Sequence, residues 1–272
     1  MLPPRRILVH IDDAQSAPRR LMVARDLARP LDADVLACYA ATPSAKHHSL
    51  QVGLAIRGYD EYNQQDMRRR DAAYDAFSAT CGDASNVFWV SLPEDPETLF
   101  VRQALYADYL VLQQPDLLND HSGVPAGFVD HVLVRSGKPA IVLPQSGIVR
   151  AVPRTVAIAW SETREAAHAV TSAMPLLMQA EAIHIIGYGE ESRASVAALA
   201  GRLKARRLEP KLHYLEDDGA GIGRPLLERA TEVGADLMVM GCYGHSQTRE
   251  LILGGVTRTV LDAMTLPLLM AH

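Results

Sequence analysis

Short apolar runs alternate with segments of helical periodicity along the whole chain, and this alternation constrains the fold more than any other feature. An apolar run at 7–9 opens the first half, and the pattern restarts at 155–160 after a linker at 147–153. Each half alternates about five times, which predicts a parallel sheet with helices on both faces. We therefore predict an α/β fold of two tandem doubly wound, Rossmann-like domains, residues 1–146 and 151–272, each with a five-stranded, mostly parallel sheet.

Individual elements follow from the same periodicities. The segment 41–59 carries prolines and glycines without a sustained period, so we interpret it as an insertion or mobile connection. The predicted strands lie at 5–12, 34–40, 86–92, 107–112, 139–143, 155–160, 182–188, 211–215, 237–240 and 267–270, and the main predicted helices lie at 18–30, 60–80, 93–106, 161–177, 191–208 and 223–233.

The two halves are imperfect repeats of one another. The run at 138–144 matches the run at 266–270, whereas Gln113 to Asp116 stand where the second half has Gly241 to Gly244. The first half has thus lost two glycines and gained a carboxylate, which would repel a triphosphate. We expect no nucleotide there, and we interpret Asp12 and Asp13 as caps at a helix start.

Three glycines, at 241, 244 and 254, lie between the apolar strand at 237–240 and the helical pattern that begins with Gly255, Val256 and Thr257. Glycine permits positive φ and a close approach to a ligand, and a helix start offers unpaired N–H groups and the positive end of its dipole. This order favours a phosphate cradle, although the same glycines could merely shape a turn and interrupt a helix.

The spacing G-x2-G-x9-G, followed by a small residue and Val-Thr, resembles the nucleotide-binding motif of the universal stress protein family. Gly255 replaces the Ser or Thr usual in that family, and Ser161 replaces its aspartate. The likeness is to the tandem type, whose domains are described as adenine nucleotide alpha hydrolase-like. It implies binding of ATP, with or without Mg²⁺, or of another adenine nucleotide in the C-terminal domain. The residues implicated are Ala159, Trp160, Ser161, Met240, Gly241, Gly244, His245, Ser246, Gly254, Gly255, Val256 and Thr257.

The resemblance also suggests how such a protein acts. It implies a regulatory or protective binder in the stress response, with the two halves paired about a pseudo-twofold axis through the strands at 139–143 and 267–270. Homodimers and a protein partner are compatible with it. Two alternatives stay open: a slow ATP hydrolase, and a nucleotide-free module that binds a partner protein or a small ligand.

Catalytic and metal-binding motifs give little support to an enzyme. The sequence has no G-x-S-x-G elbow and no Walker lysine after the glycines, so we predict no catalytic residues and at most slow hydrolysis of ATP. His10, His168 and His184 have no partner at metal-ligand spacing, and we interpret them as structural.

Composition excludes several further classes. The net charge of −5 gives no basic footprint for nucleic acid. No apolar run is long enough for a signal or membrane segment, so no membrane association is expected. Cys38, Cys81 and Cys242 are widely spaced, which argues against a disulfide framework and favours the cytoplasm.

Overall fold

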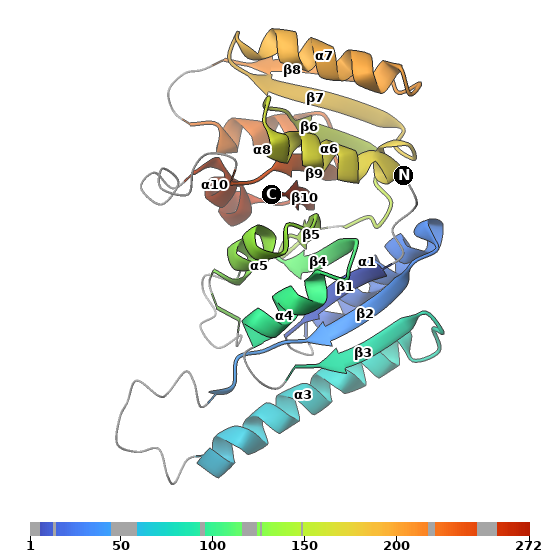
Figure 1. Cartoon of the computed structure of the whole chain (residues 1–272), viewed down its shortest axis with the longest axis vertical. Helices are drawn as coiled ribbons and strands as arrows, with labels where there is room; N and C mark the ends of the chain where they lie inside the picture. The colour runs from blue at the N-terminus through green and yellow to red at the C-terminus, as the bar shows by residue number, and fades with distance from the viewer. Residues whose placement is uncertain are drawn as a thin grey trace. The chain divides into compact units, whose positions relative to one another are not determined.

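The structure is a computed structural model that describes residues 6–12, 15–44, 59–92, 96–115, 124–125, 127–147, 149–216, 221–243 and 255–272. It divides into two compact units, Met1–Ser136 and Gly137–His272. Strands and helices alternate through both (Figure 1), which confirms the predicted α/β fold with mostly parallel strands.

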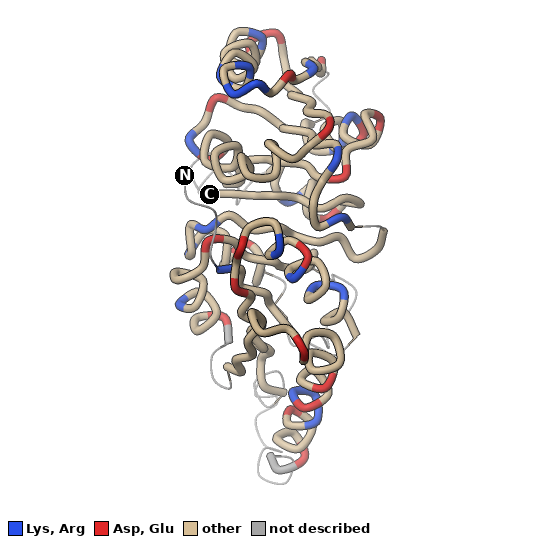
Figure 2. The backbone as a smooth tube through the Cα atoms, turned by 90° about the vertical axis from the view of Figure 1, so that its right-hand side faces the viewer, with Lys and Arg blue, Asp and Glu red and all other residues tan. Residues whose placement is uncertain are grey.

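The first unit contains a parallel sheet in the order β3-β2-β1-β4, with β1 in the interior. Ile7, Leu8 and Val9 on β1 are completely buried because strands flank it on both sides. Acidic and basic residues intermingle along α3 (Figure 2), as expected of a helix with a solvated face. The elements are β1 (Arg6–Ile11), α1 (Ala17–Leu31), β2 (Asp34–Tyr39), α3 (Tyr59–Cys81), β3 (Val87–Ser91), α4 (Pro96–Ala104), β4 (Tyr109–Gln113) and α5 (Phe128–Ser136).

The second unit contains strands in the order β5-β10-β9-β6-β7-β8, all parallel except β5, which is antiparallel to β10. Its central strands β6 and β9 are almost wholly buried. Its elements are β5 (Ala140–Leu143), β6 (Thr155–Ala159), α6 (Arg164–Leu177), β7 (Ala182–Tyr188), α7 (Ser192–Lys204), β8 (Lys211–Leu215), α8 (Gly223–Glu232), β9 (Leu237–Gly241), α10 (Val256–Ala263) and β10 (Leu268–Ala271).

The last strands of the two halves, β5 and β10, pair with each other, as the predicted contact between 139–143 and 267–270 requires. Ile141 lies opposite Leu269 in the antiparallel ladder of β5 and β10. Because of this ladder, β5 belongs to the second unit, and the division between units falls at Ser136, ahead of the predicted linker at 147–153.

The predicted capping role of Asp12 is wrong. The N-cap of α1 is Ser16, whose side chain makes no capping hydrogen bond. The Asp12 carboxylate instead accepts a hydrogen bond from the guanidinium of Arg20, which is completely buried. A buried cation requires a counter-charge, so Asp12 serves that purpose. Asp13 lies outside the described residues.

The segment predicted as an insertion is only partly described. Ser44 marks its described edge, where the backbone N–H and the Oγ of Ser44 donate to the Asp66 carboxylate at 2.9 and 2.6 Å. These contacts fix residue 44 to α3, and the prediction for 45–58 lies outside the described residues.

Candidate functional site

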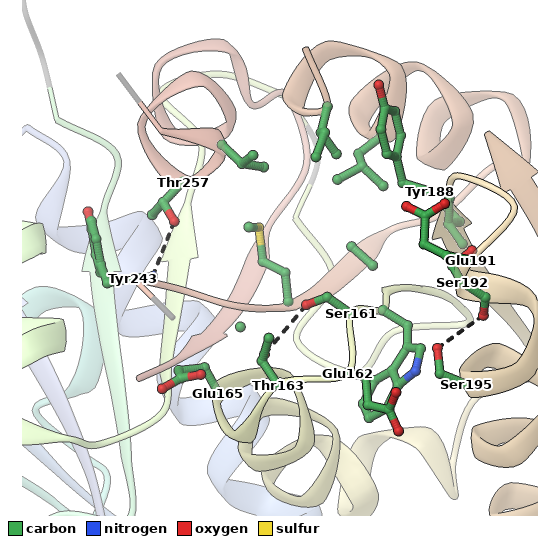
Figure 3. A pocket seen from close by; sticks show the side chains of 18 residues that line it. Ser161, Glu162, Thr163, Glu165, Tyr188, Glu191, Ser192, Ser195, Tyr243 and Thr257 are labelled. Atoms are coloured by element: carbon green, nitrogen blue, oxygen red, sulfur yellow. Dashed lines mark hydrogen bonds between the residues drawn. The ribbon is translucent and has the colours of Figure 1, made fainter. Parts of the chain in front are cut away.

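The second unit contains a pocket of about 550 Å³ at the carboxyl ends of β6, β7 and β9 (Figure 3). The strand order reverses there, because the chain passes from β6 outward to β7 and β8 and then returns to β9 on the other side of β6. Ligands of open α/β sheets bind at this kind of crevice. The pocket therefore occupies the position expected for a ligand.

Most of the described residues that the sequence implicated meet in this pocket. Gly255 lies at its edge as the N-cap of α10. Gly244, His245, Ser246 and Gly254 lie outside the described residues. The implicated residues that line the pocket are Ala159, Trp160, Ser161, Met240, Gly241, Val256 and Thr257.

Backbone amides at the pocket mouth fall into two groups. The N–H of Cys242 donates to Ala271 O at 2.9 Å, and the N–H of Tyr243 faces Thr257 Oγ1 at 3.4 Å. The N–H groups of Val256 and Thr257 open α10, which has no side-chain cap, and they have no hydrogen-bond partner within the described ranges. The start of α10 therefore offers free donors and a positive helix end to an anion.

At the carboxyl end of β6, the groups available to a ligand are side chains rather than backbone amides. The Trp160 N–H donates to Ile186 O at 2.9 Å, so this amide is committed to the sheet. The Trp160 indole Nε1 is buried and has no hydrogen-bond partner in the described part of the chain. Ser161 is exposed, and its Oγ lies 3.4 Å from Thr163 Oγ1, so it can turn toward a ligand hydroxyl.

Gly241 serves packing, which differs from the predicted reason for this glycine. A Cβ at residue 241 would lie 2.4 Å from Ala166 N and 2.7 Å from Glu165 C. The backbone of α6 thus touches the end of β9, and any side chain at this position would displace it. Tyr243, two residues later, adopts the left-handed conformation with φ of 56°.

The sequence interpretation missed the wall formed by β7 and α7. Tyr188, Glu191, Ser192 and Ser195 line the pocket from this side. Ser192 Oγ donates to Gly189 O at 2.7 Å, and Ser195 Oγ donates to Ser192 O at 3.0 Å, which orders this wall. The available signal was topological, because the carboxyl ends of neighbouring parallel strands meet at one edge of a sheet.

Carboxylates dominate the charge of the pocket. Glu162, Glu165 and Glu191 line it, and Glu165 is only 2% exposed. Burial alone would raise the pKa of Glu165, but hydrogen bonds from Arg164 and from the backbone, with the charges of Arg164 and His272, lower that pKa below its usual value. Glu165 is therefore ionised at neutral pH.

The described ranges contain no group of three or more His, Cys, Asp or Glu side chains arranged to hold a metal ion. None of their helices is both long and apolar enough to cross a membrane.

These features define the second unit as a doubly wound α/β domain with a ligand pocket at its switch point. Residues 154–272 match the model of the universal stress protein family. They form a universal stress protein domain, and the two-domain architecture of the chain fits the tandem type of that family. A comparison with curated proteins found no match.

Solved structures share the fold over nearly the whole chain. A universal stress protein from Archaeoglobus fulgidus DSM 4304 aligns with 98% of this chain and 95% of its own, at 14% identity and a TM-score of 0.73. A candidate universal stress protein from Pseudomonas aeruginosa UCBPP-PA14 aligns with 98% of this chain and 93% of its own, at 14% identity and a TM-score of 0.65. Identities this low establish the fold alone.

A shorter match comes from a structure of a universal stress protein in complex with cAMP. It aligns with 44% of this chain and 98% of its own, at 22% identity and a TM-score of 0.38. The cAMP complex is a property of that protein.

Proposed function

We propose that the second unit binds ATP or another adenine nucleotide and that the chain acts as a regulatory or protective binder in the stress response. One observation carries this proposal: Val256 and Thr257, whose N–H groups have no hydrogen-bond partner within the described residues, line the pocket at the switch point of the sheet. Helix N-termini bind phosphate groups through such donors and through the helix dipole.

The remaining lining suits a nucleoside. Ala159, Ile186 and Met240 present apolar surface to a planar base. The Trp160 indole N–H is a donor that requires an acceptor, and a purine ring nitrogen provides one. The Ser161 hydroxyl can bind a ribose hydroxyl. Any Mg²⁺ would enter with the phosphates, because no metal-ligating cluster exists within the described residues.

We further propose that residues 1–146 are a degenerate copy of the same domain with a scaffolding role. The support comes from the carboxyl end of β1, where Arg20 neutralises Asp12. The Asp12 carboxylate already accepts a charge-assisted hydrogen bond from the buried Arg20 guanidinium. It therefore binds a ligand more weakly than an unpaired carboxylate would.

Two measurements test the nucleotide site. Purified protein is denatured by heat and the supernatant is analysed for adenine nucleotides, and the intact chain is titrated with adenosine, AMP and ATP, each with and without Mg²⁺. Ile222→Trp should weaken binding at least tenfold, because Ile222 lines the pocket and a larger ring fills it. Met178→Trp is the matched control, since Met178 is exposed at the end of α6.

Absence of any adenine compound from the supernatant, together with no binding in the titrations, would reject the nucleotide site. That result would favour the nucleotide-free alternative. Equal weakening by both tryptophan variants would show that the pocket is not where the ligand binds.

A further inference from the structure

The described part of the pocket lining carries ionisable side chains of one sign only. Three carboxylates, those of Glu162, Glu165 and Glu191, line the pocket, and its described lining contains no Lys, Arg or His. Adenosine, AMP, ADP and ATP share one base and one sugar and differ in phosphate charge. A lining of this kind therefore discriminates among them by charge.

Glu165 differs from the other two carboxylates because water does not reach it. It is 2% exposed, whereas Glu162 and Glu191 are exposed and screened by solvent. The side chain of its ion-pair partner Arg164 is 84% exposed. Water therefore screens the positive charge of Arg164 more strongly than it screens the negative charge of Glu165. The charge of Glu165 thus persists inside the site.

Glu165 also lies at the end of the pocket where phosphates would bind. A Cβ at Gly241 would lie 2.7 Å from Glu165 C, which places the backbone of Glu165 against the last residue of β9, where the predicted glycine motif begins. Figure 3 shows Glu165 on the same side as Tyr243 and Thr257, with Tyr188 and Glu191 on the other. The positive end of α10, where Val256 and Thr257 line the same pocket, amounts to about half a unit charge.

We propose that this pocket selects adenine ligands of low charge, a nucleoside or a nucleoside monophosphate, over magnesium-free polyphosphates, and that Glu165 is the specificity-determining residue. The proposal rests on the adenine-nucleotide site proposed above. One helix terminus supplies about half a positive charge, less than the negative charge of a single phosphate group. Every further phosphate therefore adds repulsion from a carboxylate that solvent does not screen.

Calorimetric titration of the full chain with adenosine, AMP, ADP and ATP in EDTA tests this selectivity. The Kd should rise along the phosphate series, with ATP at least tenfold weaker than AMP, a difference of about 1.4 kcal/mol. Glu165→Gln removes the charge and keeps the shape, so it should reduce the ratio to about threefold or less. Glu228→Gln makes the same change at an exposed position on α8 outside the pocket lining and should leave the ratio unchanged.

A second measurement needs only the wild-type chain and holds even if Glu165→Gln does not fold. Excess Mg²⁺ lowers the charge of ATP and should narrow its gap to AMP.

The outcomes distinguish failure of this selectivity from failure of the proposed adenine-nucleotide site. Magnesium-free ATP that binds wild-type protein as tightly as AMP, or a gap between ATP and AMP that excess Mg²⁺ leaves unchanged, would overturn the selectivity. A ratio that survives Glu165→Gln would overturn the role of Glu165. Failure of all four compounds to bind would instead reject the adenine site itself.

Discussion

Gly241 matches a nucleotide-binding motif, but packing within the chain explains why this residue is a glycine. The predicted glycine motif begins at this residue, and phosphate cradles need glycines so that the ligand can approach the backbone closely. Here the close approach is made by the backbone of α6, and Gly241 is not among the described residues with positive φ. The same glycine therefore fixes the position of α6, and with it Glu165, at the pocket wall.

Gly241→Ala should destabilise the chain. All three nearest atoms to the new Cβ are backbone atoms of residues 165 and 166, between 2.4 and 2.9 Å away. They cannot move aside without shifting α6, so the expected loss is about 1 to 3 kcal/mol. Urea unfolding in a Trp89→Phe background, in which the fluorescence comes from Trp160, measures it.

Gly201→Ala is the matched control within the second unit. Gly201 lies inside α7, and a Cβ there would meet nothing within 4 Å. The substitution should stabilise the helix by about 0.5 to 1 kcal/mol. If Gly241→Ala left stability unchanged and only weakened ligand binding, the packing role of Gly241 would be wrong.

Strands β7 and β8 are joined by a pair of histidines. His184 Nδ1 lies 2.8 Å from His213 Nε2, and the rings stack with centroids 5.1 Å apart. The pKa of His184 is lowered by burial, then by His213 and Lys211. Burial, then Arg229 and Lys211, lowers the pKa of His213, against a raising effect of Glu232.

Acid should therefore destabilise the second unit through this pair. The unfolded histidines titrate near pH 6.5, above their folded pKa values, so the unfolded chain binds protons first as the pH falls. The contribution to stability is complete above about pH 6.5 and is lost as the pH falls through the folded pKa values. Urea unfolding of wild-type protein at a series of pH values between about 7 and 5 should show this decline.

His213→Gln should make the decline shallower, because it removes one titrating ring and the repulsion on His184. His131→Gln, on α5 of the first unit, serves as the control and should follow the wild-type curve. Parallel slopes for wild-type and His213→Gln protein would show that the pair does not set the pH dependence.

Elements of this fold were predictable where burial dictates the residues. Interior parallel strands such as β6 and β9 are continuous apolar runs, so their positions follow directly from the sequence. The wall formed by Tyr188 and Ser195 was not predictable in the same way. These polar residues carry no local motif, and only the strand order brings them to the ends of β6 and β9.

Side-chain partners were the least predictable feature. A carboxylate before a helix usually caps it, and nothing local to Asp12 distinguishes a cap from the counter-ion of Arg20. The distinction depends on the complete burial of Arg20, which arises from packing that the sequence does not encode locally.

At the scale of the whole chain, the two units differ in the charged groups at corresponding strand ends. The end of β1 holds an acid matched by a buried arginine, whereas the end of β6 has the neutral Ser161 beside a pocket. A domain whose strand ends are internally neutralised has less to gain from a ligand than one with free donors. This contrast supports the proposed division of the repeat into a supporting copy and a binding copy.

Hydrogen exchange on the intact chain tests this division of labour. Saturating adenosine should slow exchange in residues 155–161 and 255–259, which surround the pocket, and should leave 6–12 and 109–113 unchanged. A ligand present at about one hundred times its Kd stabilises the folded state by about 2.7 kcal/mol, so protection in the binding unit should increase by up to about a hundredfold.

Ile222→Trp at the same adenosine concentration provides the control, because it should remove the effect without altering exchange in the first unit. Protection that appeared equally at the ends of β1 and β6 would mean that the first unit also binds, and that the pairing of Asp12 with Arg20 does not close its site.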